Sequence, residues 1–256
     1  MRAGDQLICS GATFPRPEDI NLIIDKGTGF ILKKHDASTT VCIMKGSNFG
    51  FPCDLLVKRF NYRGFFDFMV HRLFDGRARR LWRTNLLLYR KGLPVPEPYT
   101  YTEASLKQKN AFFLSSVIDD AESLSGCYRR GIVHANKGLV RKLAETIAHW
   151  HCSGAVHGDL KWPNILLQNN SETYGCFFID LDQARIFQKP SIKGIIKDLT
   201  RFYRFGCEMG AEKWVDAEFF PEYTVFIPDT IKKKIDFTMI KNMARKDWIQ
   251  KGQRRY

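Results

Sequence analysis

One polar segment of the chain carries a carboxylate and an amide at a fixed spacing, Asp159 and, five positions later, Asn164. An apolar run, residues 165–167, follows directly, and a second apolar run, residues 177–179, ends at Asp180. Apolar runs of this length separated by turn residues predict a loop, a short strand, a turn and a second strand. Such a path returns the second carboxylate toward the first, so the three polar side chains are expected to converge on one site.

This order and spacing match the catalytic loop and the metal-binding aspartate of kinase-fold phosphotransferases, whose loop pattern is H-x-D-x-x-x-x-N. In that chemistry Asp159 accepts the proton of an acceptor hydroxyl, while Asn164 and Asp180 hold a magnesium ion on the phosphates of ATP. An isolated H-G-D segment, or an isolated aspartate after a strand, is common in turns and at strand ends. Both features in this order, with strand signals between them, predict a kinase-like fold.

The predicted fold class is therefore α+β, a two-lobed protein-kinase-like fold with a small antiparallel-sheet N-lobe and a mainly helical C-lobe. The chain has 256 residues, of which 44% are hydrophobic, and this is enough for a sizeable globular core. The expected divisions are an N-terminal lead-in (1–20), the N-lobe (21–114), a hinge (115–118) and the C-lobe with the catalytic loop (119–256).

Short apolar runs separated by turn signals predict the antiparallel sheet of the N-lobe. They lie at residues 22–24, 30–32, 40–44 and 55–60. Lys58 follows an aliphatic triplet in the last run and resembles the strand lysine that contacts the α- and β-phosphates of ATP in kinases. A lysine near a strand end is otherwise usually a solvated edge residue, so the phosphate role depends on the polar residues that follow later in the chain.

Two segments of the N-lobe are candidates to cover the phosphates of ATP. Gly27 and Gly29 form a G-x-G pattern, which is common in ordinary turns. The better placed candidate is the glycine-free turn 33–39, which would use backbone N–H groups and the hydroxyls of Ser38 and Thr39. The adenine edge is expected to bind backbone groups at the hinge, around Ser115, Ser116 and Val117.

A helix is predicted between residues 61 and 92 from apolar residues at roughly helical spacing. In kinases this helix carries a glutamate that pairs with the strand lysine, but here the segment has no glutamate and only Asp67 and Asp75. Three explanations are open: Asp75 substitutes for the glutamate, another group holds Lys58, or the pairing is lost. The helix is also rich in arginine, which indicates either a solvated face or a basic lip that attracts a phosphorylated or membrane-bound acceptor.

The C-lobe contains a predicted amphipathic helix, residues 138–151, that leads into the catalytic loop. His149 and His151 lie two positions apart and point away from each other on a helix, so they cannot share a metal ion, and structural roles are favoured. Asp198 opens a helix rich in aromatic and arginine residues. It is expected to cap that helix at its N-terminus, and an alternative is that it anchors the catalytic loop through hydrogen bonds.

The 40 lysines and arginines exceed the 27 aspartates and glutamates, which leaves a net charge of +13. This surplus favours anionic partners: a nucleotide, a phosphorylated glycolipid, the acidic face of a membrane or nucleic acid. The N-terminal sequence has no apolar stretch long enough for a signal peptide, and no apolar run has the length that spans a bilayer. Seven cysteines are scattered without a C-x-x-C pair, which favours reduced thiols in a cytoplasmic protein.

Several motifs together carry a family resemblance. They are H-G-D-L-K-W-x-N-I-L, F-I-D-L-D-x-A-R-I and K-D-L-x-R-F, preceded by the L-V-K-R-F strand and the A-R-R-x-W…G-L-P-V-P-x-P segment. Over roughly residues 22–210 the chain resembles the bacterial lipopolysaccharide kinase family, whose members phosphorylate Kdo or heptose in the lipopolysaccharide inner core. The H-G-D and I-D motifs are shared with other kinase-fold phosphotransferases, whereas the combination of K-W, L-D and K-D-L-x-R is more particular.

The resemblance implies ATP, magnesium and an acceptor sugar hydroxyl on a lipid-anchored core oligosaccharide at the cytoplasmic face of the inner membrane. By motif position Asp159 is the base and Lys58 the phosphate contact. Asn164 and Asp180 are the metal ligands. Lys161 either contacts the transferred phosphate or is a solvated loop lysine. A peripheral contact with the anionic membrane through the basic surface fits this location, and nucleic acid is not expected.

Three other functions are open. A protein kinase is disfavoured because the segment between Asp180 and Lys197 is short, offers Ser191 as its only hydroxyl side chain, and lacks an A-P-E motif. A non-catalytic kinase-fold scaffold is favoured by the missing helix glutamate and the glycine-poor loop. A nucleic-acid binder is suggested only by the net charge, with no recognisable motif beside it.

Overall fold

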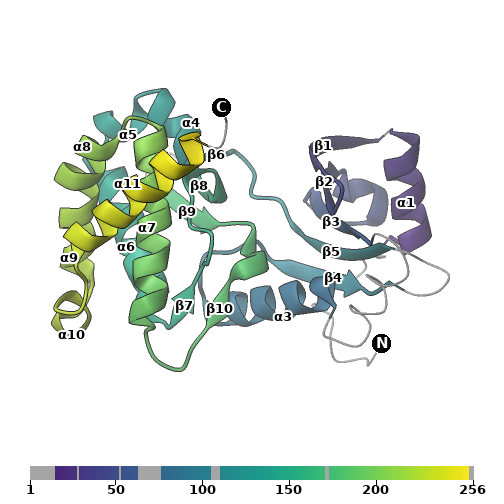
Figure 1. Ribbon diagram of the computed structural model, residues 1–256. Coiled ribbons are helices and arrows are strands. Elements are labelled where there is room, and N and C mark those ends of the chain that lie inside the picture. Colours follow the sequence, from purple (N-terminus) through teal and green to yellow (C-terminus); the bar gives the residue numbers. More distant parts are fainter. Residues whose placement is uncertain are drawn as a thin grey trace. The chain divides into compact units, whose positions relative to one another are not determined.

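The structure is a computed structural model that describes residues 15–27, 29–51, 53–62, 76–104, 110–170 and 173–253. The chain forms two compact units. The first unit comprises Met1–Gly92 and Pro96–Ile118, and the second comprises Leu93–Val95 and Asp119–Tyr256. Figure 1 shows the elements of each unit. None of the helices in the described ranges combines the length and the hydropathy needed to cross a bilayer.

The first unit is built on a five-stranded antiparallel sheet with the strand order β1-β2-β3-β5-β4. Its strands are β1 (Phe30–His35), β2 (Thr39–Met44), β3 (Leu55–Asn61), β4 (Pro98–Thr102) and β5 (Asn110–Ser116). A short 3-10 helix, η1 (Gly46–Phe49), lies between β2 and β3. The apolar runs at 30–32, 40–44 and 55–60 therefore form antiparallel strands as predicted.

The apolar run at 22–24 is not a strand, contrary to the sequence prediction, because it belongs to helix α1 (Pro17–Lys26). A proline and two acidic residues in the first turn favour the start of this helix. Ile20 and Ile24, four positions apart, are both buried, whereas Leu22 between them is 53% exposed. Burial at a four-residue spacing is typical of a helix, and an apolar run of three residues is too short to reveal that spacing.

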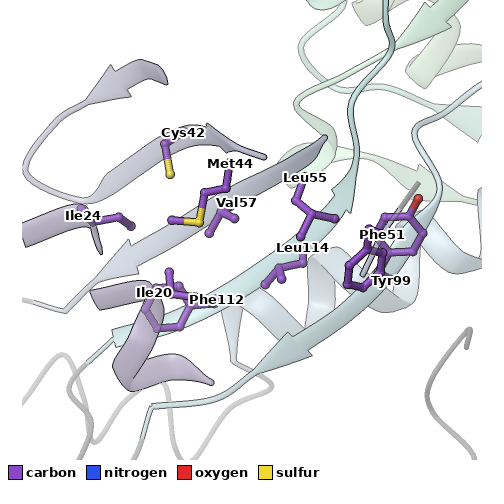
Figure 2. Packing of buried hydrophobic residues seen from close by; sticks show 10 residues of the cluster. All are labelled: Ile20, Ile24, Cys42, Met44, Phe51, Leu55, Val57, Tyr99, Phe112 and Leu114. Atoms are coloured by element: carbon purple, nitrogen blue, oxygen red, sulfur yellow. The ribbon is translucent and has the colours of Figure 1, made fainter. Parts of the chain in front are cut away.

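Helix α1 packs on one face of the sheet, as Figure 2 shows. The buried cluster consists of Ile20, Ile24, Cys42, Met44, Phe51, Leu55, Val57, Tyr99, Phe112 and Leu114. Beside it Arg59 of β3, which is 8% exposed, donates from Nη1 to Asp25 at 2.8 Å and to Asn21 at 3.3 Å, both on α1. The apolar cluster and this ion pair together hold α1 on the face toward which Val57 and Arg59 point.

The opposite face of the sheet carries Lys58 and packs against helix α3 (Arg77–Arg90). Paired residues of neighbouring antiparallel strands lie on the same face. Lys58 pairs with Phe113, and Phe113 pairs with Tyr101. The ring of Tyr101 lies 5.1 Å from that of Trp82 on α3. The strand lysine and the arginine-rich helix therefore share one face of the sheet, which is the arrangement that the predicted N-lobe requires.

The second unit is mainly helical. Its helices are α4 (Leu124–Arg129), α5 (Ile132–Ala135), α6 (Lys137–Cys152), α7 (Ile192–Glu208), α8 (Glu212–Trp214), the π-helix η4 (Val215–Phe219), α9 (Phe220–Phe226), α10 (Asp229–Lys232) and α11 (Phe237–Gln253). Helix α11 packs along α7 (Figure 1). The predicted amphipathic helix at 138–151 is confirmed as α6, whose buried face includes Leu139, Leu143 and Ile147.

The strands of the second unit are short. An antiparallel sheet with the order β6-β8-β9 contains β6 (Ala121–Ser123), β8 (Ile165–Asn170) and β9 (Thr173–Phe178). Two-residue strands, β7 (Ala155–Val156) and β10 (Arg185–Ile186), pair with each other. The 3-10 helices η2 (Trp162–Asn164) and η3 (Leu181–Gln183) flank the hairpin formed by β8 and β9. This hairpin is the segment that the sequence predicted between the two carboxylates.

An aromatic cluster ties the predicted catalytic loop to the helices. Trp162 is fully buried, and its ring centroid lies 5.5 Å from that of Phe202 and 6.0 Å from that of Phe205, both on α7. Trp214 approaches the same ring edge-on at 5.4 Å. Edge-on and tilted ring contacts of this kind are favourable beyond the area that they bury. The tryptophan that follows Lys161 in the sequence motif therefore anchors the loop in the core.

Candidate active site

The loop that carries Asp159 leads into β8, which returns as β9 in an antiparallel hairpin. At the open end of the hairpin, Ile179 donates its N–H to the carbonyl oxygen of Asn164 at 3.0 Å. Asn164 directly precedes β8, and Asp180 follows Ile179, so both lie at the same end of the hairpin. The predicted order of loop, strand, turn and strand is therefore confirmed.

The side chain of Asn164 folds back onto Asp159. Its Nδ2 donates to the carbonyl oxygen of Asp159 at 3.0 Å and lies 3.4 Å from the carboxylate Oδ2. Lys161 closes the turn between them, because its N–H donates to the Asp159 carbonyl at 2.8 Å and its own carbonyl accepts from the Asn164 N–H at 2.9 Å. The spacing of five positions thus produces a closed turn in which the amide contacts the carboxylate.

Asp198 of α7 holds this loop at its start. The carboxylate is fully buried and accepts the N–H of His157 at 2.6 Å and the N–H of Gly158 at 2.8 Å. Gly158 has φ of 80°, and a Cβ at this position would lie 2.6 Å from the carbonyl oxygen of Gln183. Only glycine fits a left-handed residue with backbone that close. The glycine of the H-G-D motif is therefore required by the packing of the loop.

The prediction that Asp198 caps the N-terminus of its helix is wrong. Helix α7 begins earlier, and the hydroxyl of Ser191 caps it by accepting the N–H of Gly194 at 3.2 Å. Glycine is a poor helix former, so Gly194 in the first turn argued against a helix start at this position. A Cβ there would lie 2.3 Å from Cγ2 of Val156, so close packing on β7 explains the glycine. Asp198 has the alternative role that the sequence suggested, which is to anchor the loop.

His157 connects the loop to the end of the hairpin. The ring is completely buried, its Nε2 donates to the carbonyl oxygen of Ile179 at 3.0 Å, and its Nδ1 accepts the N–H of Asp159 at 3.3 Å. Only the neutral ring with its proton on Nε2 makes both hydrogen bonds. Burial lowers the pKa of His157, which favours the same neutral form. The histidine of the motif therefore positions Asp159 and the segment before Asp180 together.

A further histidine lies behind Asp198. Nδ1 of His151, on α6, lies 2.8 Å from the hydroxyl of Tyr223 on α9, and its Nε2 lies 3.6 Å from Oδ2 of Asp198. The second distance is too long for a hydrogen bond. His151 is fully buried, and its Nε2 has no hydrogen-bond partner among the described residues. These contacts give His151 a structural place, as expected, and extend the support of the loop to two more helices.

Two cations face the carboxylate of Asp159. Nη1 of Arg201 lies 2.7 Å from Oδ1, and Nζ of Lys161 lies 3.0 Å from Oδ2. The sequence prediction included Lys161 but missed the contact of Arg201. A signal was available, because Arg201 follows Asp198 by three positions and residues at that spacing share a face of a helix. A residue three positions after the loop anchor is therefore placed to meet the loop.

Asn164 and Asp180 offer the oxygen atoms that magnesium prefers. Asn164 directs its Nδ2 to Asp159, which leaves the amide oxygen to meet a cation. Asp180 is exposed and has a left-handed backbone, with φ of 60° and ψ of 57°, a conformation that is uncommon outside glycine and is concentrated at functional sites. The described ranges contain no cluster of three His, Cys, Asp or Glu suited to a metal. Magnesium in kinase sites nevertheless needs only one or two protein oxygens beside the substrate phosphates, so these residues fit it.

Lys58 belongs to the first unit. It is 8% exposed in a central strand, and its Nζ lies 5.7 Å from the ring centroid of Phe60. It is therefore not the solvated edge lysine of the alternative interpretation. Asp67 and Asp75, which were considered as substitutes for the helix glutamate, lie outside the described residues. The three explanations for the missing helix glutamate therefore stay predictions.

The turn between β1 and β2 is closed by Asp36. Its carboxylate accepts the N–H groups of Ser38 and Thr39, both at 2.8 Å, and the Ser38 hydroxyl at 2.9 Å. The neighbouring Lys34 ammonium, followed by these Ser38 donors, holds the pKa of Asp36 well below its usual range. The donors predicted to cover the phosphates therefore already have an anionic partner. A phosphate would have to displace Asp36 to use them.

The predicted hinge residues lie at the end of β5. Ser115 is in the strand ladder, and the N–H of Ser116 donates to the carbonyl oxygen of Glu97 at 2.9 Å. The N–H of Val117 donates to the carbonyl oxygen of Asp54 at 3.2 Å. Two of the N–H groups considered for the adenine edge are thus engaged within the first unit. Adenine recognition at this segment stays a prediction.

Comparison with known proteins identifies the family. The model of the lipopolysaccharide kinase (Kdo/WaaP) family matches residues 57–220, which is more than half of the chain. The match begins in β3, next to Lys58, and includes the loop, the hairpin and α7. The chain belongs to the lipopolysaccharide kinase family. Membership supports a phosphotransferase that uses ATP and acts in lipopolysaccharide biosynthesis.

A solved structure, of WaaP in complex with acyl carrier protein, has a similar fold. This family member is 16% identical to the solved chain, and the match covers 88% of this chain and 90% of that one with a TM-score of 0.62. At this identity the similarity establishes the fold and not the roles of residues. No curated protein matches the chain. The predicted protein-kinase-like α+β fold is confirmed.

Proposed function

We propose that this lipopolysaccharide kinase family member transfers the γ-phosphate of ATP to a sugar hydroxyl of the lipopolysaccharide inner core, on Kdo or heptose. The observation that carries the proposal is the closed turn in which Asn164 contacts Asp159, with Asp180 at the same end of the hairpin. Packing alone does not require two carboxylates and an amide at that position. A kinase base and its metal ligands do.

Asp159 is the proposed base. Its side chain is 16% exposed, so an acceptor hydroxyl can reach the carboxylate. The hydroxyl oxygen forms a bond to the γ-phosphorus, the bond from that phosphorus to the β,γ-bridging oxygen breaks, and ADP leaves. The hydroxyl proton passes to Asp159. Lys161, at 35% exposure, is proposed to contact the transferred phosphate from nucleotide binding onward.

Asn164 and Asp180 are the proposed magnesium ligands. A bound magnesium ion would neutralise charge on the phosphates and orient them. His157 supports the backbone beside this pair, since its ring forms hydrogen bonds with Asp159 at the start of the loop and with Ile179, which directly precedes Asp180. Positioning and charge neutralisation are the main contributions that a protein makes to phosphoryl transfer.

The first unit is proposed to hold the nucleotide. Lys58, on the face of the sheet that packs against α3, is assigned to the α- and β-phosphates. The remaining contacts follow the sequence prediction: Ser38 and Thr39 for the phosphates, and Ser115, Ser116 and Val117 for the adenine edge. Binding would require the present partners of several of these donors to be released, Asp36 among them.

The acceptor is proposed to be lipid-anchored, which would bring the protein to the cytoplasmic face of the inner membrane as a peripheral protein. The net charge of +13 supports contact with an anionic surface. A carrier protein is a second proposed partner, because the similar WaaP was solved with acyl carrier protein. Mass spectrometry of proteins that purify with the native chain tests this partner, and repeated absence of a carrier protein would argue against it.

The test of the proposal is Asp159→Asn, which keeps the shape of the side chain and removes the base. Phosphorylation of isolated core glycolipid should fall about 10²–10⁴-fold, the usual contribution of a positioned base. Magnesium ATP should still raise the melting temperature. Asp247→Asn, an exposed aspartate of α11, is the matched control and should keep full activity. Unchanged turnover in Asp159→Asn would defeat the proposal.

Mass spectrometry of lipopolysaccharide from cells with and without the chain would identify the sugar. The two other kinase-fold hypotheses, a protein kinase and a non-catalytic scaffold, have separate tests. A radiolabel assay on cell lysate separates lipid-linked from protein-linked phosphate. Ser191, the hydroxyl considered for a protein kinase, caps α7. Failure to bind magnesium ATP in a thermal-shift titration would instead support a non-catalytic scaffold.

A further inference from the structure

Arg201 of α7 makes a direct ion pair with the proposed base, since its Nη1 lies 2.7 Å from Oδ1 of Asp159. Both side chains are largely shielded from solvent, with 29% of Arg201 and 16% of Asp159 exposed. We propose that Arg201 is a positioning residue for the phosphoryl transfer, which holds Oδ1 and thereby presents Oδ2 to the acceptor hydroxyl. The inference rests on the proposed function and adds a residue to it.

Arg201 and Asp198 act on the loop from one face of α7, because residues three positions apart lie side by side on a helix. Asp198 binds the N–H groups of His157 and Gly158, and Arg201 binds the carboxylate of Asp159. Two side chains of one helix therefore hold three consecutive residues of the loop. An ion pair with such a fixed geometry differs from an exposed pair between two mobile side chains, which contributes little.

The two oxygens of Asp159 have partners of different kinds. Oδ1 meets a guanidinium, which is planar, always charged and preorganised for carboxylates. Oδ2 meets Nζ of Lys161 at 3.0 Å and Nδ2 of Asn164 at 3.4 Å, the second distance being long for a hydrogen bond. The lysine ammonium is carried on a flexible four-carbon stem. An arriving phosphate can therefore draw Lys161 from Oδ2 while Arg201 stays in place.

This difference gives each cation its own task. As the nucleotide binds, Lys161 turns to the γ-phosphate and exposes Oδ2. The acceptor oxygen bonds to phosphorus, the bridging oxygen leaves with ADP, and the acceptor proton passes to Oδ2 of Asp159. Arg201 keeps Oδ1 throughout. Without Arg201, Lys161 would have to neutralise the charge of Asp159 and contact the phosphate at the same time.

The experiment compares steady-state kinetics of three variants with magnesium ATP and isolated core glycolipid. Arg201→Gln should lower kcat about 10²-fold, as expected when a reacting group loses its orientation, with KM for ATP within about threefold of wild type. Arg201→Lys should recover part of the loss and stay about tenfold below wild type, because it keeps the charge without the fork. Lys161→Met should instead raise KM for ATP about tenfold or more, since it loses a ground-state contact.

Lys197→Gln provides the matched control, because it removes one exposed positive charge one helical turn before Arg201 and should leave kcat unchanged. The inference is overturned if Arg201→Gln keeps kcat within about threefold of wild type, or if it raises KM for ATP as Lys161→Met does. If Arg201→Gln does not fold, Arg201→Lys decides: a lower kcat at unchanged KM supports the inference, and wild-type kcat overturns it.

The outcome also separates this inference from the function on which it rests. A wild-type chain that does not phosphorylate core glycolipid contradicts the proposed function. A wild-type chain that does so, together with an equally active Arg201→Gln, contradicts the role of Arg201 alone.

Discussion

The two units hold their central polar residues by different means. In the first unit Lys58 lies in β3 between two neighbouring strands, so the alternation of the strand and the ladder register orient it. In the second unit Asp159 lies in a loop, and side chains from α7, Asp198 and Arg201, hold it in place. A ladder tolerates the loss of one side chain, because the backbone makes the hydrogen bonds. A loop held by side chains does not.

The largest effect is expected for Asp198→Ala, which removes the main support of the loop. The N–H groups of His157 and Gly158 would be left buried without an acceptor, so the free energy of unfolding should fall by about 3–5 kcal/mol. Urea unfolding followed by the fluorescence of the buried tryptophans in the second unit measures the change. Asp198→Asn keeps one acceptor oxygen and should lower the free energy of unfolding by less. An unchanged midpoint in Asp198→Ala would remove the contrast between the two units.

A smaller loss of stability is expected for Ile20→Ala in the first unit. Ile20 is fully buried between α1 and the sheet, so its truncation should cost about 2–4 kcal/mol through lost burial and a cavity. Hydrogen exchange of the β2 and β3 amides measures the loss, and exchange in the loop around Asp159 should not change. Leu22→Ala, on the exposed face of α1, should stay within about 0.5 kcal/mol of wild type. Equal effects at the two positions would contradict the packing of α1.

Gly158→Ala should cost less stability than Asp198→Ala and have a large effect on activity. A left-handed backbone costs a residue with a Cβ about 1–2 kcal/mol, and the same cost applies to Gly210→Ala, where φ is 66° and the space is open. Only at Gly158 would the Cβ meet a backbone oxygen, that of Gln183. Displacement of the loop should lower turnover about 10²-fold. Similar turnover in the two variants would show that the loop can absorb the shift.

Local patterns predicted the elements that carry the site. The hairpin between Asn164 and Asp180 was visible as two apolar runs with a turn between them, and α6 was visible as an amphipathic period. Helix α1 was missed because residues 22–24 look like a strand unless the burial of Ile20 and Ile24 is known. The start of α7 was missed because a glycine in its first turn is required by packing against Val156, which is distant in the sequence.

The chemical groups of the site are evident without a structure, because Asp159, Asn164 and Asp180 lie within one short stretch whose turns are encoded locally. Their supports are less evident, since the sequence suggested loop anchoring by Asp198 only as an alternative and did not predict the contact of Arg201. Asp198 lies 41 positions from His157, and Arg201 lies 42 positions from Asp159. Contacts at that separation depend on how α7 packs against the loop, whereas the three-position spacing of Asp198 and Arg201 indicates only that the two side chains share a face of the helix. For this reason the motif could predict the candidate site residues, while the folded chain had to show which long-range contacts hold them.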